Sequence, residues 1–164
     1  MNVLDYKKIE MNKISLMPKD DRIFLKYSGS PFRILTPAMI TPFGVEEHFN
    51  RKYISLEFGI EPEGELKEFH TFFKNLDNYI QYTIRGNLIS SIKNERHILL
   101  RVQLPANFIG CEFFNAAGRR ITSFDITPGD KVAAVLEILN VWKRDSVFGI
   151  NIVAKKIVVI SNGE

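Results

Sequence analysis

VAAVLEILNVWKRDSVFGINIVAKKIVV, residues 132–159, carries the strongest structural signal of the chain. Two apolar runs, 132–141 and 149–160, flank the segment 142–148. Both runs are rich in β-branched residues, and polar residues interrupt them too often for a membrane span. The pattern predicts two long strands of a hairpin joined by a short charged turn.

The tip of this hairpin combines aromatic and cationic side chains. Trp142, the sole tryptophan, stands beside Lys143 and Arg144, and Phe148 follows on the return strand. Aromatic rings stack on unpaired bases, and Lys and Arg contact phosphates. The tip is therefore a candidate contact for single-stranded nucleic acid. The structural alternative is that the tryptophan plugs the core at a strand end.

Length and composition indicate one domain spanning residues 1–164. Hydrophobic residues make up 45% of the chain, so a sizeable core can form. The net charge of +3 is compatible with a polyanionic partner. Cys111, the sole cysteine, cannot form an intrachain disulfide, and we expect a buried, inert thiol. No signal peptide or apolar run of spanning length is evident, so we expect a soluble intracellular protein.

A second aromatic and cationic group is predicted at a hairpin over residues 22–36, with its turn at a Ser-Gly-Ser-Pro sequence. It comprises Lys26, Tyr27, Phe32 and Arg33. The alternative is a solvated hairpin whose amphipathic side chains cover apolar surface. A third group, Arg119 and Arg120, emerges from a hairpin predicted between strands at 111–114 and 120–124.

The middle of the chain changes period. Residues 52–58 alternate between apolar and polar side chains and predict a half-buried strand. Apolar residues at spacings of three and four predict one long amphipathic helix at about 63–85, which covers or plugs the sheet. The connector 36–45 contains Pro37 and Pro42, and we expect that it is not a central strand.

The flanking regions give weaker signals. A strand is indicated near residues 9–16 and should end at Pro18. Residues 87–95 have no clear pattern, and 97–104 predict another strand.

No pattern indicates catalysis. His48, His70 and His97 are scattered and have no metal-ligand spacing. No phosphate-binding glycine loop, nucleophile elbow or dinucleotide fingerprint is present. We therefore expect a binding protein without catalytic activity, metal or cofactor.

Together, the short hairpins and the single long helix predict a mainly β fold. The expected architecture is a small barrel of the oligonucleotide-binding (OB) type, whose face and loops grip single strands. Aromatic and cationic groups at several hairpins fit such a role.

Four segments resemble landmarks of OB-fold single-stranded-DNA-binding proteins from large DNA viruses. In chain order they are 35–45 (LTPAMITPFGV), 52–56 (KYISL), 73–77 (FKNLD) and 141–150 (VWKRDSVFGI). The replicative single-stranded-DNA-binding proteins of some tailed phages are similar in design. The resemblance implies binding and protection of single-stranded DNA during viral replication, repair or recombination, at the replication site in the host cell.

The resemblance has limits that bear on partners. Trp142 and Phe148 correspond to landmarks of the final hairpin and not to demonstrated DNA contacts. The phage-type proteins end in an acidic tail that recruits partners, whereas residues 159–164 read VISNGE. Recruitment of replication proteins through such a tail is therefore in doubt, while a homo-oligomer is compatible with the sequence.

The predicted site combines stacking side chains with phosphate-binding cations. It comprises Lys26, Tyr27, Phe32, Arg33, Arg119, Arg120, Trp142, Lys143, Arg144 and Phe148. Two alternatives stay open: a virion or scaffold protein whose aromatics form a protein interface, and an RNA-binding OB module, which differs in its preference for the 2′-hydroxyl.

Overall fold

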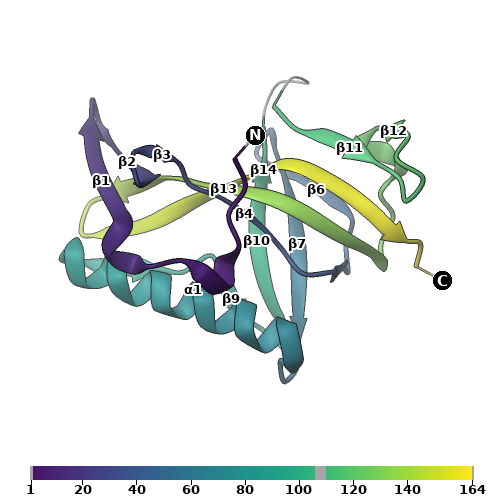
Figure 1. Cartoon of the computed structure of the whole chain (residues 1–164), viewed down its shortest axis with the longest axis horizontal. Coiled ribbons are helices and arrows are strands. Elements are labelled where there is room, and N and C mark those ends of the chain that lie inside the picture. The colour runs from purple at the N-terminus through teal and green to yellow at the C-terminus, as the bar shows by residue number, and fades with distance from the viewer. Residues whose placement is uncertain (1, 106–109, 164) are drawn as a thin grey trace.

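The computed structural model describes residues 2–105 and 110–163, and its centre is the predicted hairpin. Strands β13 (Asp130–Arg144) and β14 (Val147–Ser161) pair antiparallel along their lengths and turn at Asp145 and Ser146. Figure 1 shows both strands crossing the molecule from one side to the other. The predicted hairpin is confirmed, including its charged turn.

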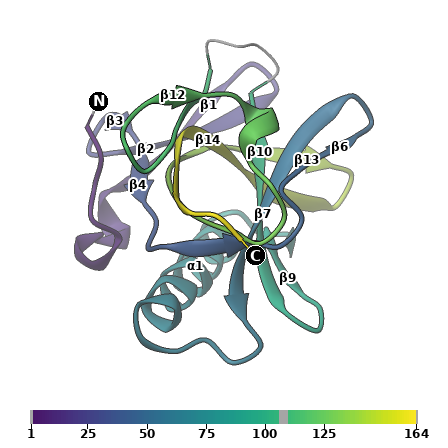
Figure 2. The same cartoon turned by 90° about the vertical axis from the view of Figure 1, so that its right-hand side faces the viewer.

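Three further strands close the hairpin into a barrel. They are β5 (Met39–Thr41), β7 (Arg51–Gly59) and β10 (Ile98–Leu104). β13 pairs with β5, β5 with β7, β7 with β10, and β10 with β14, which returns to β13. The result is a closed five-strand barrel in a mainly β chain, as predicted. Figure 2 shows β7, β10, β13 and β14 around a common interior.

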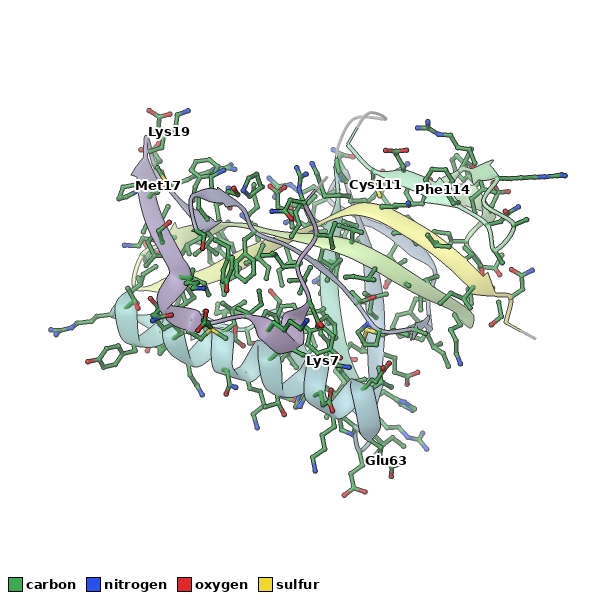
Figure 3. All side chains as sticks on the ribbon, in the orientation of Figure 1. Lys7, Met17, Lys19, Glu63, Cys111 and Phe114 are labelled. Atoms are coloured by element: carbon green, nitrogen blue, oxygen red, sulfur yellow. The ribbon has the colours of Figure 1, made fainter. Side chains whose placement is uncertain are left out.

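The remaining strands extend the sheet around the barrel. They are β1 (Ile14–Lys19), β2 (Arg22–Tyr27), β3 (Ser30–Pro31), β4 (Arg33–Leu35), β6 (Val45–His48), β8 (Asn87–Ile89), β9 (Ile92–Asn94), β11 (Glu112–Phe114) and β12 (Arg120–Ile121). Three short 3-10 helices complete the described structure: η1 (Tyr6–Lys8), η2 (Met11–Lys13) and η3 (Ser123–Asp125). β1 and β2 form a hairpin that projects from the barrel, with Met17 and Lys19 toward its end (Figure 3).

The predicted helix is α1 (Gly64–Thr83), which follows β7 and runs beside the barrel (Figure 1). Its inward face buries a stripe of aromatic and aliphatic side chains at the spacing of a helix: Phe69, Phe72, Phe73, Leu76 and Ile80. Tyr6 from the N-terminal segment packs on the rings of Phe69 and Phe72. In the described part of the chain, no helix combines the length and hydrophobicity needed to cross a membrane.

The expectation that residues 36–45 contain no central strand was wrong. β5 lies inside the barrel wall, between β13 and β7, and Ile40 is paired with residues on both sides. Pro37 and Pro42 flank this three-residue strand instead of interrupting it, so its own N–H groups remain available to the ladder.

Three further strand predictions need correction. Pro18 does not end the N-terminal strand but lies within β1, an edge strand paired only with β2 among the described residues. The segment 32–36 does not return along β2. Pairing with β2 ends at Pro31, the last residue of β3, and the next strand, β4, pairs with β13 instead. The predicted strand 120–124 stops at Ile121 and continues as η3.

Asp130 connects the start of β13 to Thr127 and Gly163 by hydrogen bonds. Its carboxylate accepts hydrogen bonds from the Thr127 backbone N–H (2.8 Å), the Thr127 hydroxyl (2.9 Å) and the Gly163 backbone N–H (2.8 Å). Burial alone would raise the pKa of this carboxyl, but the three hydrogen bonds outweigh burial and hold the pKa below its ordinary value.

We expect Asp130→Asn to lower the free energy of unfolding by about 1–3 kcal/mol at neutral pH, because a neutral amide at this buried position cannot accept the charge-assisted hydrogen bonds that the carboxylate accepts. Asp125→Asn is the matched control, since Asp125 caps an exposed turn at Thr122. Urea unfolding measures both losses, and an equal loss in the two variants would contradict the role given to Asp130.

The sign of the pH dependence follows from the lowered pKa. Asp130 contributes its full stability above the unfolded-state pKa of about 3.9, and that contribution is lost as the pH falls through the lower folded-state pKa. The stability difference between the wild type and Asp130→Asn should therefore narrow under acidic conditions.

Candidate nucleic-acid interface

Strand alternation places a set of polar and aromatic side chains on the outer surface of the barrel. In β7, Ile54 and Leu56 are buried, so Tyr53 projects outward. In β10, Leu100 and Val102 are buried, while Arg101 is exposed. Because β7 and β10 are antiparallel neighbours, these outward side chains meet on one face.

The first part of this face is a depression of about 120 Å³, which we call the aromatic section. Its lining includes Tyr53, Lys93, Arg101 and Trp142. The Arg101 guanidinium lies over the Tyr53 ring, with 4.3 Å between the guanidinium carbon and the ring centroid. This section therefore presents two aromatic rings together with two cations.

Trp142 owes its position to a glycine on the opposite strand. Trp142 and Gly149 are paired in the β13–β14 ladder. A Cβ atom added at Gly149 would lie 2.5 Å from Cζ2 of the indole. The indole thus covers the Gly149 backbone and stays half-buried along the face, which is a structural reason for the Trp–Gly pairing.

The second part of the face is a cleft of about 660 Å³, which we call the cationic section. Its lining includes Arg22, Arg51, Lys52, Arg120, Phe113 and Phe124. Phe124 is 85% exposed, and the Lys52 ammonium lies 5.5 Å from its ring centroid. A largely exposed phenyl ring beside several cations offers both stacking and phosphate contacts.

Two amide side chains join the sections, because Gln103 and Asn151 line both of them. Gln103 Nε2 donates a long hydrogen bond of 3.4 Å to Asn151 Oδ1. Asn151 Nδ2 donates a 2.7 Å hydrogen bond to Oδ1 of the buried Asn140. The two sections therefore adjoin at these neutral amides, and we call them together the groove.

The charge along this groove has one sign. Lys93 and Arg101 line the aromatic section, and four more cations line the cationic section. Among the described residues, no Asp or Glu lines either section, and none of these cations forms an ion pair. Glu63 and Glu65, which lie outside the groove lining, are at the start of α1, where Figure 3 labels Glu63. The groove is thus suited to a polyanion.

The structure places some predicted residues in this groove. Trp142 lines the aromatic section and Arg120 the cationic section. Arg144 lies two residues beyond Trp142 on β13, so it faces the same side at the end of the hairpin. Lys143 and Arg119 are exposed but line neither section.

The prediction that Phe32 and Phe148 stack on bases was wrong. Phe32 is 0% exposed and Phe148 is 2% exposed, and both belong to the hydrophobic core. Phe148 also packs against Gly86, where an added Cβ would lie 3.2 Å from the phenyl ring. A base could reach either ring only if the core opened.

Two of the remaining residues of the 22–36 group, Arg33 and Tyr27, make structural contacts. Arg33 Nε donates to Glu137 Oε1 at 2.7 Å in a partly buried ion pair, so its charge is already neutralised. The Tyr27 hydroxyl accepts a hydrogen bond from the Glu10 N–H, and its ring packs 5.4 Å from that of Phe32. Lys26 is half-buried and lines neither section of the groove.

Several groove residues were missed because they lie on strand faces and not at hairpin tips. They include Tyr53, Lys93, Arg101, Gln103 and Asn151, and a further missed residue, Phe124, lies on η3. The signal was present in the alternation of residues 52–58 and 98–104, whose outward positions carry Tyr53, Arg101 and Gln103. Their convergence depends on strand pairing, which the alternation alone does not specify.

Cys111 lies beside the cationic section, near the start of β11 (Figure 3). It is buried, as predicted, and burial raises the pKa of its thiol to about 12. The thiol therefore stays protonated at neutral pH and is a poor nucleophile.

We expect Gly149→Ala to move the Trp142 indole away from the sheet, because the added methyl group occupies the space of the ring. The sole tryptophan should then emit at longer wavelength, with far-ultraviolet circular dichroism retained. Fluorescence of the purified variant measures this change. An emission spectrum identical to that of the wild type would contradict the described packing.

Comparison with known proteins bears on the fold. No protein-family model and no curated protein matches the chain. The single-stranded DNA-binding protein from bacteriophage Enc34 is similar in structure, with a TM-score of 0.57, 14% identity, and coverage of 93% of this chain and 92% of that one.

Two further structures of that phage protein show the same likeness. Its C-terminal truncation gives a TM-score of 0.55 at 13% identity, over 94% of this chain and 99% of that one. Its complex with single-stranded DNA gives 0.59 at 14% identity, over 93% of this chain and 97% of that one. At this level of identity, the likeness establishes a shared fold.

Proposed function

We propose that this protein binds single-stranded DNA along the groove, without strong sequence preference and without catalysis. The observation that carries the proposal is the groove itself, in which exposed or half-buried aromatic rings alternate with cations and no described carboxylate intrudes. The structural likeness to a phage protein solved with single-stranded DNA supports the same function.

Unpaired bases would stack on rings at both ends of the groove. Trp142 and Tyr53 serve the aromatic section, and Phe124 serves the cationic section. Stacking on an aromatic side chain contributes about 1–3 kcal/mol per base and tolerates any base, because every base has a π-face. A duplex keeps its bases stacked inside the helix, so it cannot use these rings.

The backbone of the strand would follow the cations. Arg101 and Lys93 meet phosphates beside the aromatic rings, and Arg22, Arg51, Lys52 and Arg120 meet them in the wider cleft. Two of these cations, Arg101 and Lys52, already lie against rings and are therefore held near the groove wall. Phosphate binding releases counterions, so affinity should fall steeply as salt rises.

The biological setting follows from this activity. A protein that covers exposed single strands serves DNA replication, repair or recombination, and the phage likeness favours a viral genome as the substrate. Contacts with replication proteins and self-association along the strand are further parts of the proposal.

The direct test is a fluorescence titration that uses Trp142, the sole tryptophan. We expect oligo-dT to quench the emission, the matched duplex to have little effect, and the affinity for oligo-dT to weaken sharply between two salt concentrations. An oligo-rU titration separates DNA from RNA preference. If the protein binds none of these nucleic acids at low salt, the proposed function is overturned.

Adjacent arginines provide a matched charge test. Arg120 lines the cationic section, whereas its neighbour Arg119 is exposed but does not. We expect Arg120→Gln to weaken oligo-dT binding and to reduce the slope of log affinity against log salt by about 0.7, the value for one lost phosphate contact on a single strand. Arg119→Gln should leave the slope close to that of the wild type.

The arginine comparison is decided by salt titrations of the two purified variants. Equal slopes for Arg119→Gln and Arg120→Gln would mean that net charge, and not the cleft, determines binding.

A further inference from the structure

The turn between β6 and β7 holds an aromatic residue in a conformation that disfavours it. Phe49 and Asn50 connect His48 and Arg51, which pair across the hairpin. Both turn residues have positive φ, 52° at Phe49 and 63° at Asn50. The first turn position suits Asn, Asp or Gly, and a bulky side chain is strained there.

No packing in the described structure compensates for this strain. Phe49 is 99% exposed, the highest exposure among the large hydrophobic side chains described. A phenyl ring that contacts solvent throughout contributes nothing to the core, while it disfavours the turn. A residue that is unfavourable for the folded chain and fully accessible is a candidate for contact with a ligand.

The position of the turn identifies the ligand chemistry. Asn50 and Arg51, the next two residues, line the cationic section, but Phe49 itself does not. Phe49 is therefore directly adjacent in the chain to the lining of the cleft that we assign to single-stranded DNA. The ligand group that suits an aromatic ring at this position is the next base of the same DNA strand.

We propose that Phe49 provides an additional stacking position for a base that has left the cationic section, so that the binding site extends beyond the groove onto the β6–β7 turn. This inference rests on the proposed function. It assigns to Phe49 a role in determining how many nucleotides one molecule occupies.

Phe49→Asn is the informative variant, because it separates binding from stability. Asn adopts left-handed backbone more readily than Phe, so the variant should have an unchanged or higher melting temperature. Phe49→Tyr retains a stackable ring and serves as the matched control.

The measurement is the affinity for oligo-dT strands of increasing length, from about 4 to about 20 nucleotides, for the three proteins. Short strands that fill only the groove should bind all three equally. Beyond the length that reaches the turn, we expect Phe49→Asn to bind about 5-fold or more weakly than the wild type, and Phe49→Tyr to match the wild type.

The outcomes separate this inference from the proposed function. If wild type binds oligo-dT but Phe49→Asn binds equally at every length, the additional position does not exist. A loss of equal size at every length would also overturn it, because the effect would then belong to the groove. If wild type binds no oligo-dT at any length, the proposed function itself fails.

Discussion

The fold depends on satisfying the backbone hydrogen bonds of one long strand. β13 has 15 residues, and its two edges are covered by β14 on one side and by β2, β4 and β5 in succession on the other. Three register shifts interrupt its pairing with β14. Such bulges increase local bend and twist, and they let two long strands curve until β5, β7 and β10 complete the closure.

Closure has a direct consequence for the surface. A closed barrel separates side chains by alternation into an interior that must be apolar and an exterior that is free to carry chemistry. α1 and the N-terminal segment cover part of the barrel with packed aromatic rings. The exterior of β7, β10 and the β13–β14 hairpin lines much of the groove, so the core and the proposed binding surface lie on opposite faces of the same strands.

Pairing also brings together groups that are distant in the chain. Tyr53 and Arg101 belong to strands separated by the whole of α1, yet their side chains stack. Gln103 and Asn151 come from β10 and β14 and link the two sections of the groove. The two sections adjoin because neighbouring strands each contribute outward side chains at matching heights.

The sequence predicted the elements better than the site. Period and β-branched content were sufficient for the long hairpin, β7 and α1, because these signals are local. The partner of β4 and the central place of β5 depend on tertiary pairing, which three-residue strands do not encode. Trp142 and Arg120, chosen for their chemistry, line the groove. Phe32 and Phe148 were chosen in the same way but are buried, because residue type does not reveal which side chains face the core.

The most direct test of the groove is photo-cross-linking of a bromodeoxyuridine-substituted oligonucleotide, with the cross-linked peptides identified by mass spectrometry. Tyr82 on α1 is the internal control, because it is 87% exposed and lines neither section of the groove. We expect cross-links at Tyr53, Phe124 and Trp142 and none at Tyr82. Cross-links at Tyr82 in the absence of any in the groove would contradict binding along the groove.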